Sequence, residues 1–427
     1  MTEPLIHIQH FIASITVYSE AKNDILVDAF RQISRLLGQP DGQDNYEMLL
    51  NYYSQLCSAL YRVSPGGSLP DYLFELALYD DNQFTRTCAS NDFFQIPRAI
   101  KQAAAFDLNA LCAVSQISCE TVKEAIAERY PEQKQFLNLL PGYETKHQKY
   151  RMEQPWGDHI LKIAEFNRSN GVGIFSRYNA FSYSEEHGLI PVKNFDPIRL
   201  SDLKHYELQR QKIIDNTLGF LEGKPYNNVL LYGDRGTGKS STVKALLNEY
   251  KDRGLRIVEI PKQHLLCLDR VVEQIADLPM KFILFIDDLS FNEDDKSFGI
   301  LKAMLEGSVF KRPDNIAIYA TTNRRHIIKE TFTAREGDEV HRADTIDEAL
   351  SLSDRFGLCV TFTVPTKDKY LDIVRLLAED RALPVDTDEL LKGAERFALS
   401  KGGRSPRLAR QFVDNIESRL ALNLPLF

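Results

Sequence analysis

The sequence contains few cysteines, and none of them are paired at a metal-binding spacing. No Cys-x-x-Cys pair occurs, so the sequence suggests neither a zinc site nor a disulfide framework. Thiols without such a framework fit a reducing compartment best. The six cysteines are scattered over 427 residues, at Cys57, Cys88, Cys112, Cys119, Cys267 and Cys359.

Long apolar runs and an excess of basic charge are also missing. No stretch reaches the roughly 20 apolar residues that a membrane-spanning helix needs, and the first residues, MTEPLIHIQH, lack the basic start and apolar run of a signal peptide. We therefore expect no membrane contact and a cytoplasmic location. A net charge of -8 argues against non-specific coating of nucleic acid, although a local basic groove stays compatible with it.

What is present is an ordinary globular composition, with 43% hydrophobic and 26% charged residues. The chain is too long for one typical core, which predicts two or three domains. Apolar residues recur at helical spacing before Pro155, so we expect a mainly α-helical N-terminal domain over residues 1–155. Its expected helices cover residues 24–37, 46–62, 72–81, 96–105 and 120–129.

Residues 156–202 have a different character, with recurrent aromatic residues and few helical spacings. We interpret them as a linker or connector with a possible hairpin. The segment from Asp196 to Leu203 then leads into a helix over about 206–223. Many ATPases hold adenine at such a lead-in before a phosphate-binding strand, and a plain domain linker is the alternative.

The strongest motif is Gly233-x-x-x-x-Gly238-Lys239-Ser240, which follows an apolar strand over 228–232 and opens a helical pattern. Strand, glycine-rich turn and helix in this order are typical of a P-loop, in which backbone N–H groups and the helix N-terminus face phosphate. A tight turn without a ligand is the alternative. Lys239 would contact the β- and γ-phosphates, and the Ser240 hydroxyl would ligate Mg²⁺. The predicted ATP-binding residues are Gly233, Asp234, Arg235, Gly236, Thr237, Gly238, Lys239, Ser240 and Ser241.

After the P-loop, apolar strands alternate with helical patterns, as a parallel sheet covered on both faces requires. Strands are expected at 255–260, 281–286, 316–320 and 358–363, within an ATPase core over 203–365. The remaining residues, 366–427, carry three helical segments that fit a C-terminal helical lid.

The strand KFILFI ends in Asp287 and Asp288. A carboxylate at the end of a buried strand is the Walker B arrangement, in which Asp287 would hold Mg²⁺ and Asp288 would orient or deprotonate the attacking water. A strand that merely meets an acidic turn is the alternative. The next strand ends in Thr321-Thr322-Asn323, which puts polar side chains where many P-loop sheets face the γ-phosphate.

The strings NNVLLYGDRGTGKSS, FILFIDDLSF, ATTNRRH and SLSDRFGL closely resemble the bacterial AAA+ family catalogued as domain of unknown function 815. The resemblance implies an α/β fold, a P-loop AAA+ parallel sheet with a helical lid, and an ATPase that uses ATP and Mg²⁺. By this resemblance, Asn323 is the sensor 1 residue and Arg407 the sensor 2 residue. Arg355 is the arginine finger, acting in trans within a homo-oligomer. A surface ion pair of Arg355 with Asp354 or Glu379 is the alternative.

Two features depart from the AAA+ remodelling enzymes. Most of these carry glutamate as the second Walker B carboxylate, whereas helicase loaders and initiators carry aspartate, as here at Asp288. No aromatic pore loop is recognisable at residues 260–263. Slow hydrolysis is therefore expected, and threading of polypeptide loses support.

Three functions follow. The first is a Mg²⁺-dependent ATPase that hydrolyses ATP to ADP and phosphate to remodel an unknown protein or nucleic-acid partner. The second is a slow nucleotide-dependent switch or loader, similar to helicase loaders and initiators, with contact to DNA left open. The third, a scaffold with a degenerate site, is disfavoured because Lys239, Ser240, Asp287 and Asn323 are all present.

Overall fold

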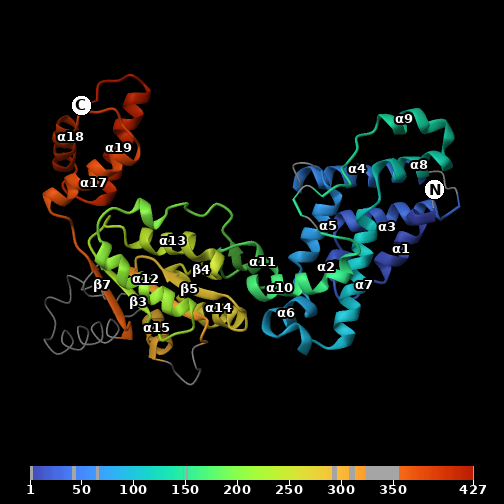
Figure 1. Ribbon diagram of the computed structural model, residues 1–427, viewed down its shortest axis with the longest axis horizontal. Coiled ribbons are helices and arrows are strands. Elements are labelled where there is room, and N and C mark those ends of the chain that lie inside the picture. Colours follow the sequence, from blue (N-terminus) through green and yellow to red (C-terminus); the bar gives the residue numbers. More distant parts are fainter. Residues whose placement is uncertain are drawn as a thin grey trace. The chain divides into compact units, whose positions relative to one another are not determined.

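The computed structural model describes residues 3–40, 45–63, 67–147, 149–150, 152–290, 296–306, 313–323 and 355–426. The chain divides into two compact units, Met1–Arg177 and Tyr178–Phe427. Among the described residues, no helix has the length and the apolar content needed to cross a membrane. Figure 1 shows helices alone in the first unit and both helices and strands in the second, as the fold-class prediction requires.

The division between the units falls inside the stretch 156–202, which the sequence analysis interprets as a connector. Its first part contains helix α10 (Ile160–Asn170) and the short α11 (Gly173–Arg177). Its second part forms the hairpin of β1 (Ala180–Ser184) and β2 (Gly188–Pro191). Helix α10 was not expected, because its fully buried residues are only Ile163, Ala164 and Asn167, which make a weak helical pattern.

The N-terminal unit is helical, as predicted. Polar side chains define where its helices begin: Asp24 accepts hydrogen bonds from the N–H groups of Leu26 and Val27, and Asn82 forms a capping box with Thr85. The main helices are α1 (Glu3–Ala13), α3 (Ile25–Leu37), α4 (Asn45–Val63), α5 (Leu69–Leu78), α6 (Gln83–Ser90), α7 (Arg98–Ser115) and α8 (Cys119–Arg129).

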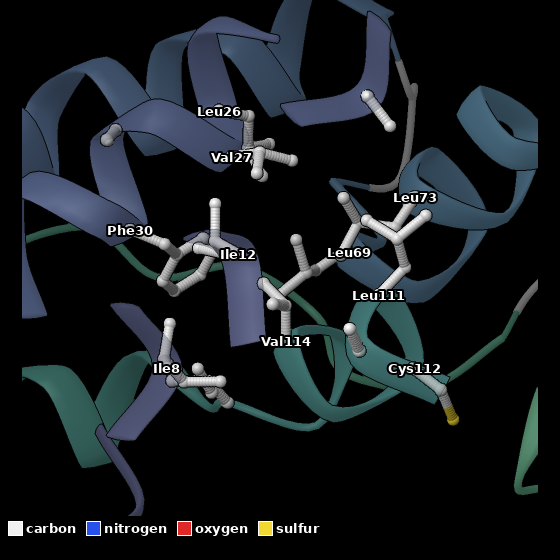
Figure 2. Close-up of a cluster of buried hydrophobic side chains, with 14 of the residues drawn as sticks. Ile8, Ile12, Leu26, Val27, Phe30, Leu69, Leu73, Leu111, Cys112 and Val114 are labelled. Atoms are coloured by element: carbon white, nitrogen blue, oxygen red, sulfur yellow. The ribbon is translucent and has the colours of Figure 1, made fainter. Parts of the chain in front are cut away.

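The core of this unit joins helices that are distant in the sequence. Figure 2 shows Ile12 of α1 beside Phe30 of α3, with Leu111 and Val114 of α7 nearby. The buried carboxylate of Asp107 on α7 accepts hydrogen bonds from the backbone N–H groups of residues 16–18. This contact gives partners to three successive N–H groups, among them that of the buried Tyr18, so it anchors the segment after α1.

A second buried carboxylate, Asp80, makes the stability of this unit depend on pH. Asp80 is 3% exposed, and its Oδ1 accepts a hydrogen bond of 2.8 Å from Asn82. Burial raises the pKa of Asp80 to about 7, the bond from Asn82 lowers it, and the charges of Glu20 and Asp81 add to the rise. The unfolded-state pKa is about 3.9. Between these values the folded state binds more protons than the unfolded state, so stability falls as pH rises.

The free energy of unfolding of the wild type should therefore fall between about pH 4 and pH 7. We expect this fall to be smaller in Asp80→Asn, by an amount on the order of a few kcal/mol. The measurement is urea unfolding at several pH values, with tryptophan fluorescence as the signal. Trp156 is the single tryptophan of the chain and is fully buried in this unit, so its emission reports the unit alone. Glu128→Gln, which removes an exposed carboxylate, is the control. A pH dependence identical to wild type in Asp80→Asn would contradict the expectation.

Among its described residues, the second unit contains a seven-stranded sheet of order β2-β1-β4-β5-β6-β3-β7. All neighbouring strands are parallel except the hairpin pair β1 and β2. The predicted strands are confirmed to within two residues, while the pairing of β1 with β4 was not predicted. The strands are β3 (Val229–Gly233), β4 (Leu255–Glu259), β5 (Lys281–Ile286), β6 (Ile316–Thr322) and β7 (Leu358–Phe362).

Helices cover both faces of the sheet, so its central strands are fully buried and read as apolar runs. On one face, α12 (Glu207–Leu221) and α13 (Lys239–Tyr250) pack through residues such as Phe220 and Leu246. On the other side lie α14 (Leu268–Ile275) and α15 (Lys296–Glu306) (Figure 1). Because the strands are parallel, their carboxyl ends meet at one edge, where ligands bind in such sheets.

Three helices at the C-terminal end, α17 (Lys367–Asp380), α18 (Thr387–Ser400) and α19 (Pro406–Ala421), have a core of their own. In Figure 1 they are the orange and red helices. Tyr370, Val374, Ala394 and Val413 are among its fully buried residues. The three helical segments expected over residues 366–427 are thus present.

Candidate functional site

The turn between β3 and α13 requires glycine at its first position. Gly233 has φ +133°, and a Cβ there would lie 2.0 Å from the carbonyl oxygen of Phe362 on β7. The close approach is held by the N–H of Asp234, which donates to the same carbonyl at 2.9 Å. The carboxylate of Asp234 in turn accepts a hydrogen bond from the N–H of Val364 at 2.8 Å. Strand β7 therefore supports the loop from behind.

Lys239, the first residue of α13, points back into the loop. Its side chain is 6% exposed, and Nζ donates to the carbonyls of Gly233 (2.8 Å) and Asp234 (2.7 Å) and to Oδ1 of Asn323 (3.0 Å). An ammonium has three donors, so all of them are engaged. Burial lowers the pKa of Lys239, against the opposing effect of the carboxylates of Asp234, Asp287 and Asp288.

Asp287 follows β5 and receives two hydroxyl groups on one oxygen. Ser240 donates to its Oδ1 at 2.6 Å and Thr321 donates to the same atom at 2.5 Å. Hydroxyl and carboxylate oxygens are the ligands that Mg²⁺ prefers in proteins. Ser240 and Asp287 therefore fit the metal-binding roles predicted for them. Within the described parts of the chain, no cluster of three or more His, Cys, Asp or Glu side chains offers another metal site.

Asp288, the next residue, has φ +52°, which lies in the left-handed region that residues other than glycine seldom occupy. Its Oδ1 accepts a hydrogen bond of 2.6 Å from Nδ2 of Asn323, which follows β6. One amide side chain thus bridges Lys239 and Asp288. The structure brings together residues from three strand ends that are up to 84 positions apart in the sequence.

Thr321 is a site residue that the sequence pattern does not single out, although the strand end Thr321-Thr322-Asn323 is expected to face the γ-phosphate. Besides its bond to Asp287, the Thr321 hydroxyl accepts a hydrogen bond of 3.0 Å from the N–H of Asp288. The sequence does contain a signal, because two hydroxyl residues end an otherwise apolar run. This pattern does not indicate which of them, Thr321 or Thr322, faces the carboxylates.

These residues line a pocket of about 630 Å³. The lead-in segment contributes Ile198, Leu203 and Tyr206, and the lid contributes Ile373 and Leu377, so one part of the wall is apolar. The predicted residues in its lining are Arg235, Gly236, Thr237, Gly238, Lys239, Ser240, Ser241, Asp287, Asp288, Asn323 and Arg407.

The lead-in and the C-terminal helices are each hydrogen-bonded to the part of the second unit that contains the sheet. Tyr206 has φ +61°, and its hydroxyl donates to the carbonyl of Thr363 at 2.6 Å. Burial raises the pKa of Tyr206 to about 12, with a smaller contribution from the charge of Asp234. The backbone N–H of Arg407 donates to the carbonyl of Gly236 at 3.1 Å, which holds the start of α19 against the loop.

Arg355 does not line this pocket. It precedes β7 at the amino end of the sheet, whereas the loop follows the carboxyl end of β3, and the register pairs Val229 with Leu358 and Gly233 with Phe362. Four residues of parallel strand span roughly 13 Å, which is longer than an arginine side chain. Arg324 and Arg325, and the first residues of the SDRFG turn, Ser353 and Asp354, lie outside the described residues.

The comparisons with known proteins agree with this geometry. A family model described as "Protein of unknown function (DUF815)" matches residues 176–420, more than half of the chain. The proteasome-activating nucleotidase of Methanocella arvoryzae is 26% identical over 181 residues, which is 39% of each protein. The ATP-dependent zinc metalloprotease FtsH 2 of Salinibacter ruber is 25% identical over 282 residues, 57% of this chain and 38% of the protease. The chain thus spans about two fifths of the length of these relatives.

Among solved structures, the Thermotoga maritima RuvB Holliday junction branch migration motor is similar at 15% identity, with a TM-score of 0.38, over 53% of this chain and 66% of that one. The two curated relatives are named as a nucleotidase and an ATP-dependent protease. Together with the P-loop and the parallel sheet, these similarities indicate an AAA+ ATPase fold in the second unit.

Proposed function

The chain belongs to the family described as Protein of unknown function (DUF815), and from this premise we propose that it is a Mg²⁺-dependent AAA+ ATPase whose hydrolysis of ATP drives the remodelling of a partner. The observation that carries the proposal is the hydrogen-bonded group of Lys239, Ser240, Asp287, Asp288 and Asn323 at one edge of the sheet. These are the parts that transfer of a γ-phosphoryl group to water requires.

Phosphate binding is assigned to the loop and to the start of α13. The backbone N–H groups of residues 236–240 and the positive end of the α13 dipole favour an anion. Oxygens of the β- and γ-phosphates would replace the carbonyls of Gly233 and Asp234 as acceptors for Lys239. The neighbouring apolar wall of Leu203, Tyr206 and Leu377 suits a nucleoside base.

The carboxylates have separate roles in the proposal. Ser240 and Asp287 would hold Mg²⁺, which neutralises charge on the phosphates when it is bound. Asp288 would orient the attacking water and accept its proton, and Asn323 would donate a hydrogen bond to the γ-phosphate. In the structure, this amide group of Asn323 donates to Oδ1 of Asp288. A γ-phosphate that competes for this amide would release Asp288 for the reaction.

A slow nucleotide-dependent switch or loader is the second candidate. It is favoured by the short side chain of Asp288 and by its engagement with Asn323, both of which limit access to the water. The turnover number distinguishes the two candidates: about 1 s⁻¹ or more supports a motor, and a much lower rate that a partner accelerates supports a switch.

Affinity capture with the Asp288→Asn variant should identify the client, whether it is a protein or a nucleic acid. A variant that binds ATP but hydrolyses it slowly should keep its complexes together during the capture. A cytoplasmic location belongs to the same proposal, and it is supported by the six cysteines, none of which forms a disulfide.

We expect the two Walker B carboxylates to differ when each is replaced. Asp287→Ala should weaken Mg²⁺-dependent nucleotide binding, because it removes a proposed ligand of the ion. Asp288→Asn should leave binding near normal and slow hydrolysis by roughly 10²-fold or more, the scale of a lost general base. Nucleotide titration with and without Mg²⁺, followed by steady-state hydrolysis, measures both effects. Equal losses of binding in both variants would contradict separate roles.

A further inference from the structure

Thr321 occupies a central position between the proposed catalytic elements. It lies on β6, opposite Leu231 of β3, and the next residue back, Ala320, is opposite Ile286 of β5. Its side chain is 2% exposed. Strand β6 thus connects the strand that leads into the P-loop with the strand that ends in the two carboxylates.

The Thr321 hydroxyl acts on both carboxylate residues at once. As a donor it reaches Oδ1 of Asp287 at 2.5 Å, and as an acceptor it takes the N–H of Asp288 at 3.0 Å. A hydroxyl has one hydrogen, and in this geometry the hydrogen goes to Asp287. The direction of both bonds is therefore determined.

The first bond restricts how the Asp287 carboxylate can rotate. Ser240, at the start of helix α13, donates to the same Oδ1 at 2.6 Å. If Ser240 turns toward a metal ion, the bond from Thr321 remains on Oδ1 and keeps the carboxylate plane in place. Outer partners that orient a metal ligand in this way typically contribute about 10- to 100-fold to metal affinity or activity.

The second bond holds a strained backbone. Asp288 has φ +52°, and the two N–H groups at this turn both bond to Thr321: that of Asp288 to Oγ1, and that of Leu289 to the carbonyl oxygen at 2.7 Å. A left-handed conformation at a residue with a Cβ persists only where its surroundings hold it. The direction of the Asp288 side chain thus depends on Thr321.

We infer that Thr321 is a positioning residue for ATP hydrolysis: its single hydroxyl sets the orientation of the proposed Mg²⁺ ligand Asp287 and of the proposed base Asp288. The inference rests on the proposed function and adds to it a residue that acts through the two carboxylate residues. Its loss disturbs both roles together, unlike the loss of either carboxylate alone.

The test compares Thr321→Val, which removes the hydroxyl and keeps the branched shape, with Thr321→Ser, which keeps the hydroxyl. Thr217→Val is the matched control. Thr217 is also fully buried, and its hydroxyl bonds to the carbonyl of Ile213 at 2.7 Å and to the hydroxyl of Tyr319 on β6 at 2.8 Å. It lies outside the nucleotide pocket, so it reports the general cost of a lost buried hydroxyl.

Three quantities are measured on the full chain: binding of a fluorescent ADP as Mg²⁺ is titrated, the steady-state kcat and KM for ATP at saturating Mg²⁺, and the melting temperature. We expect Thr321→Val to raise the Mg²⁺ concentration for half-maximal binding and to lower kcat, each by about 10- to 100-fold. Its KM at saturating Mg²⁺ should change little, because the loop and the apolar wall are intact. Thr321→Ser should recover most of both losses, and Thr217→Val should show neither.

Thr321→Val with the Mg²⁺ dependence and kcat of Thr217→Val would overturn the inference, as would Thr321→Ser with losses as large as those of Thr321→Val. These outcomes differ from failure of the proposed function, in which the wild-type chain binds ADP with no dependence on Mg²⁺ or does not hydrolyse ATP. If the wild type binds but does not hydrolyse, the Mg²⁺ titration alone still decides on Thr321.

Discussion

Lys239→Ala is expected to lower the turnover of ATP by more than about 10²-fold, while the protein stays folded. The Lys239 ammonium bonds to two loop carbonyls and to Asn323, and both Lys239 and Asn323 line the pocket. Its removal therefore takes the cation from the phosphate site and leaves the sheet and its covering helices in contact. Nucleotide titration, a hydrolysis assay and a thermal melt measure binding, turnover and folding separately.

Lys244→Ala is the matched control, since Lys244 lies on the same helix and outside the nucleotide pocket. It should retain binding and turnover. Normal turnover in Lys239→Ala would remove the P-loop from the proposal. Loss of the folded state would instead make Lys239 a structural residue, whose three hydrogen bonds hold the loop together.

Arg355→Ala and Lys239→Ala are each expected to be inactive alone and to regain hydrolysis when they are mixed in one oligomer. Arg355 lies at the amino end of β7, roughly 13 Å along the sheet from the loop, so we propose that it reaches only the site of a neighbouring subunit. An arginine that stabilises the transferring phosphoryl group contributes about 10³- to 10⁵-fold to the rate. In a mixed assembly, an intact loop faces an intact arginine at some interfaces.

Co-expression of the two variants with different tags, purification through both tags and a hydrolysis assay perform this test. With equal mixing, one pairing in four is competent, so a minority of the sites should work. Preparations that carry both tags on the same variant are the controls. A doubly tagged assembly that stays inactive would argue against action in trans, or would require intact sites around the whole ring. A fully active wild-type monomer would exclude the oligomeric proposal.

Much of the core was predictable because it depends on local patterns. The run KFILFI has no polar residue between its ends, and it forms the central strand β5 with the bounds that its apolar length predicts. The P-loop was recognisable for a similar reason. Its glycines, lysine and serine lie within eight consecutive positions, so their spacing in the sequence is their spacing in the turn.

Other features were not predictable, because they depend on partners far away in the chain. Helix α10 buries few residues and has a weak pattern of its own. The pairing of β1 with β4 adds a strand to the sheet across the 70 residues of chain that lie between Ser184 and Leu255. Tyr206 reaches the carbonyl of Thr363, 157 positions away. No periodicity within one segment contains this information.

The sequence by itself determined that this is a P-loop protein of α/β class with helices at both ends, because strand, turn and helix are specified by residues next to one another. Only the tertiary structure decided that Thr321, and not Thr322, holds Asp287 and Asp288, and that Arg355 lies away from its own loop. Both outcomes depend on strand order and register. Thr321 and Asp287 are 34 positions apart and meet because β6 pairs with β5, and a shift of one residue would turn the Thr321 hydroxyl to the opposite face of the sheet.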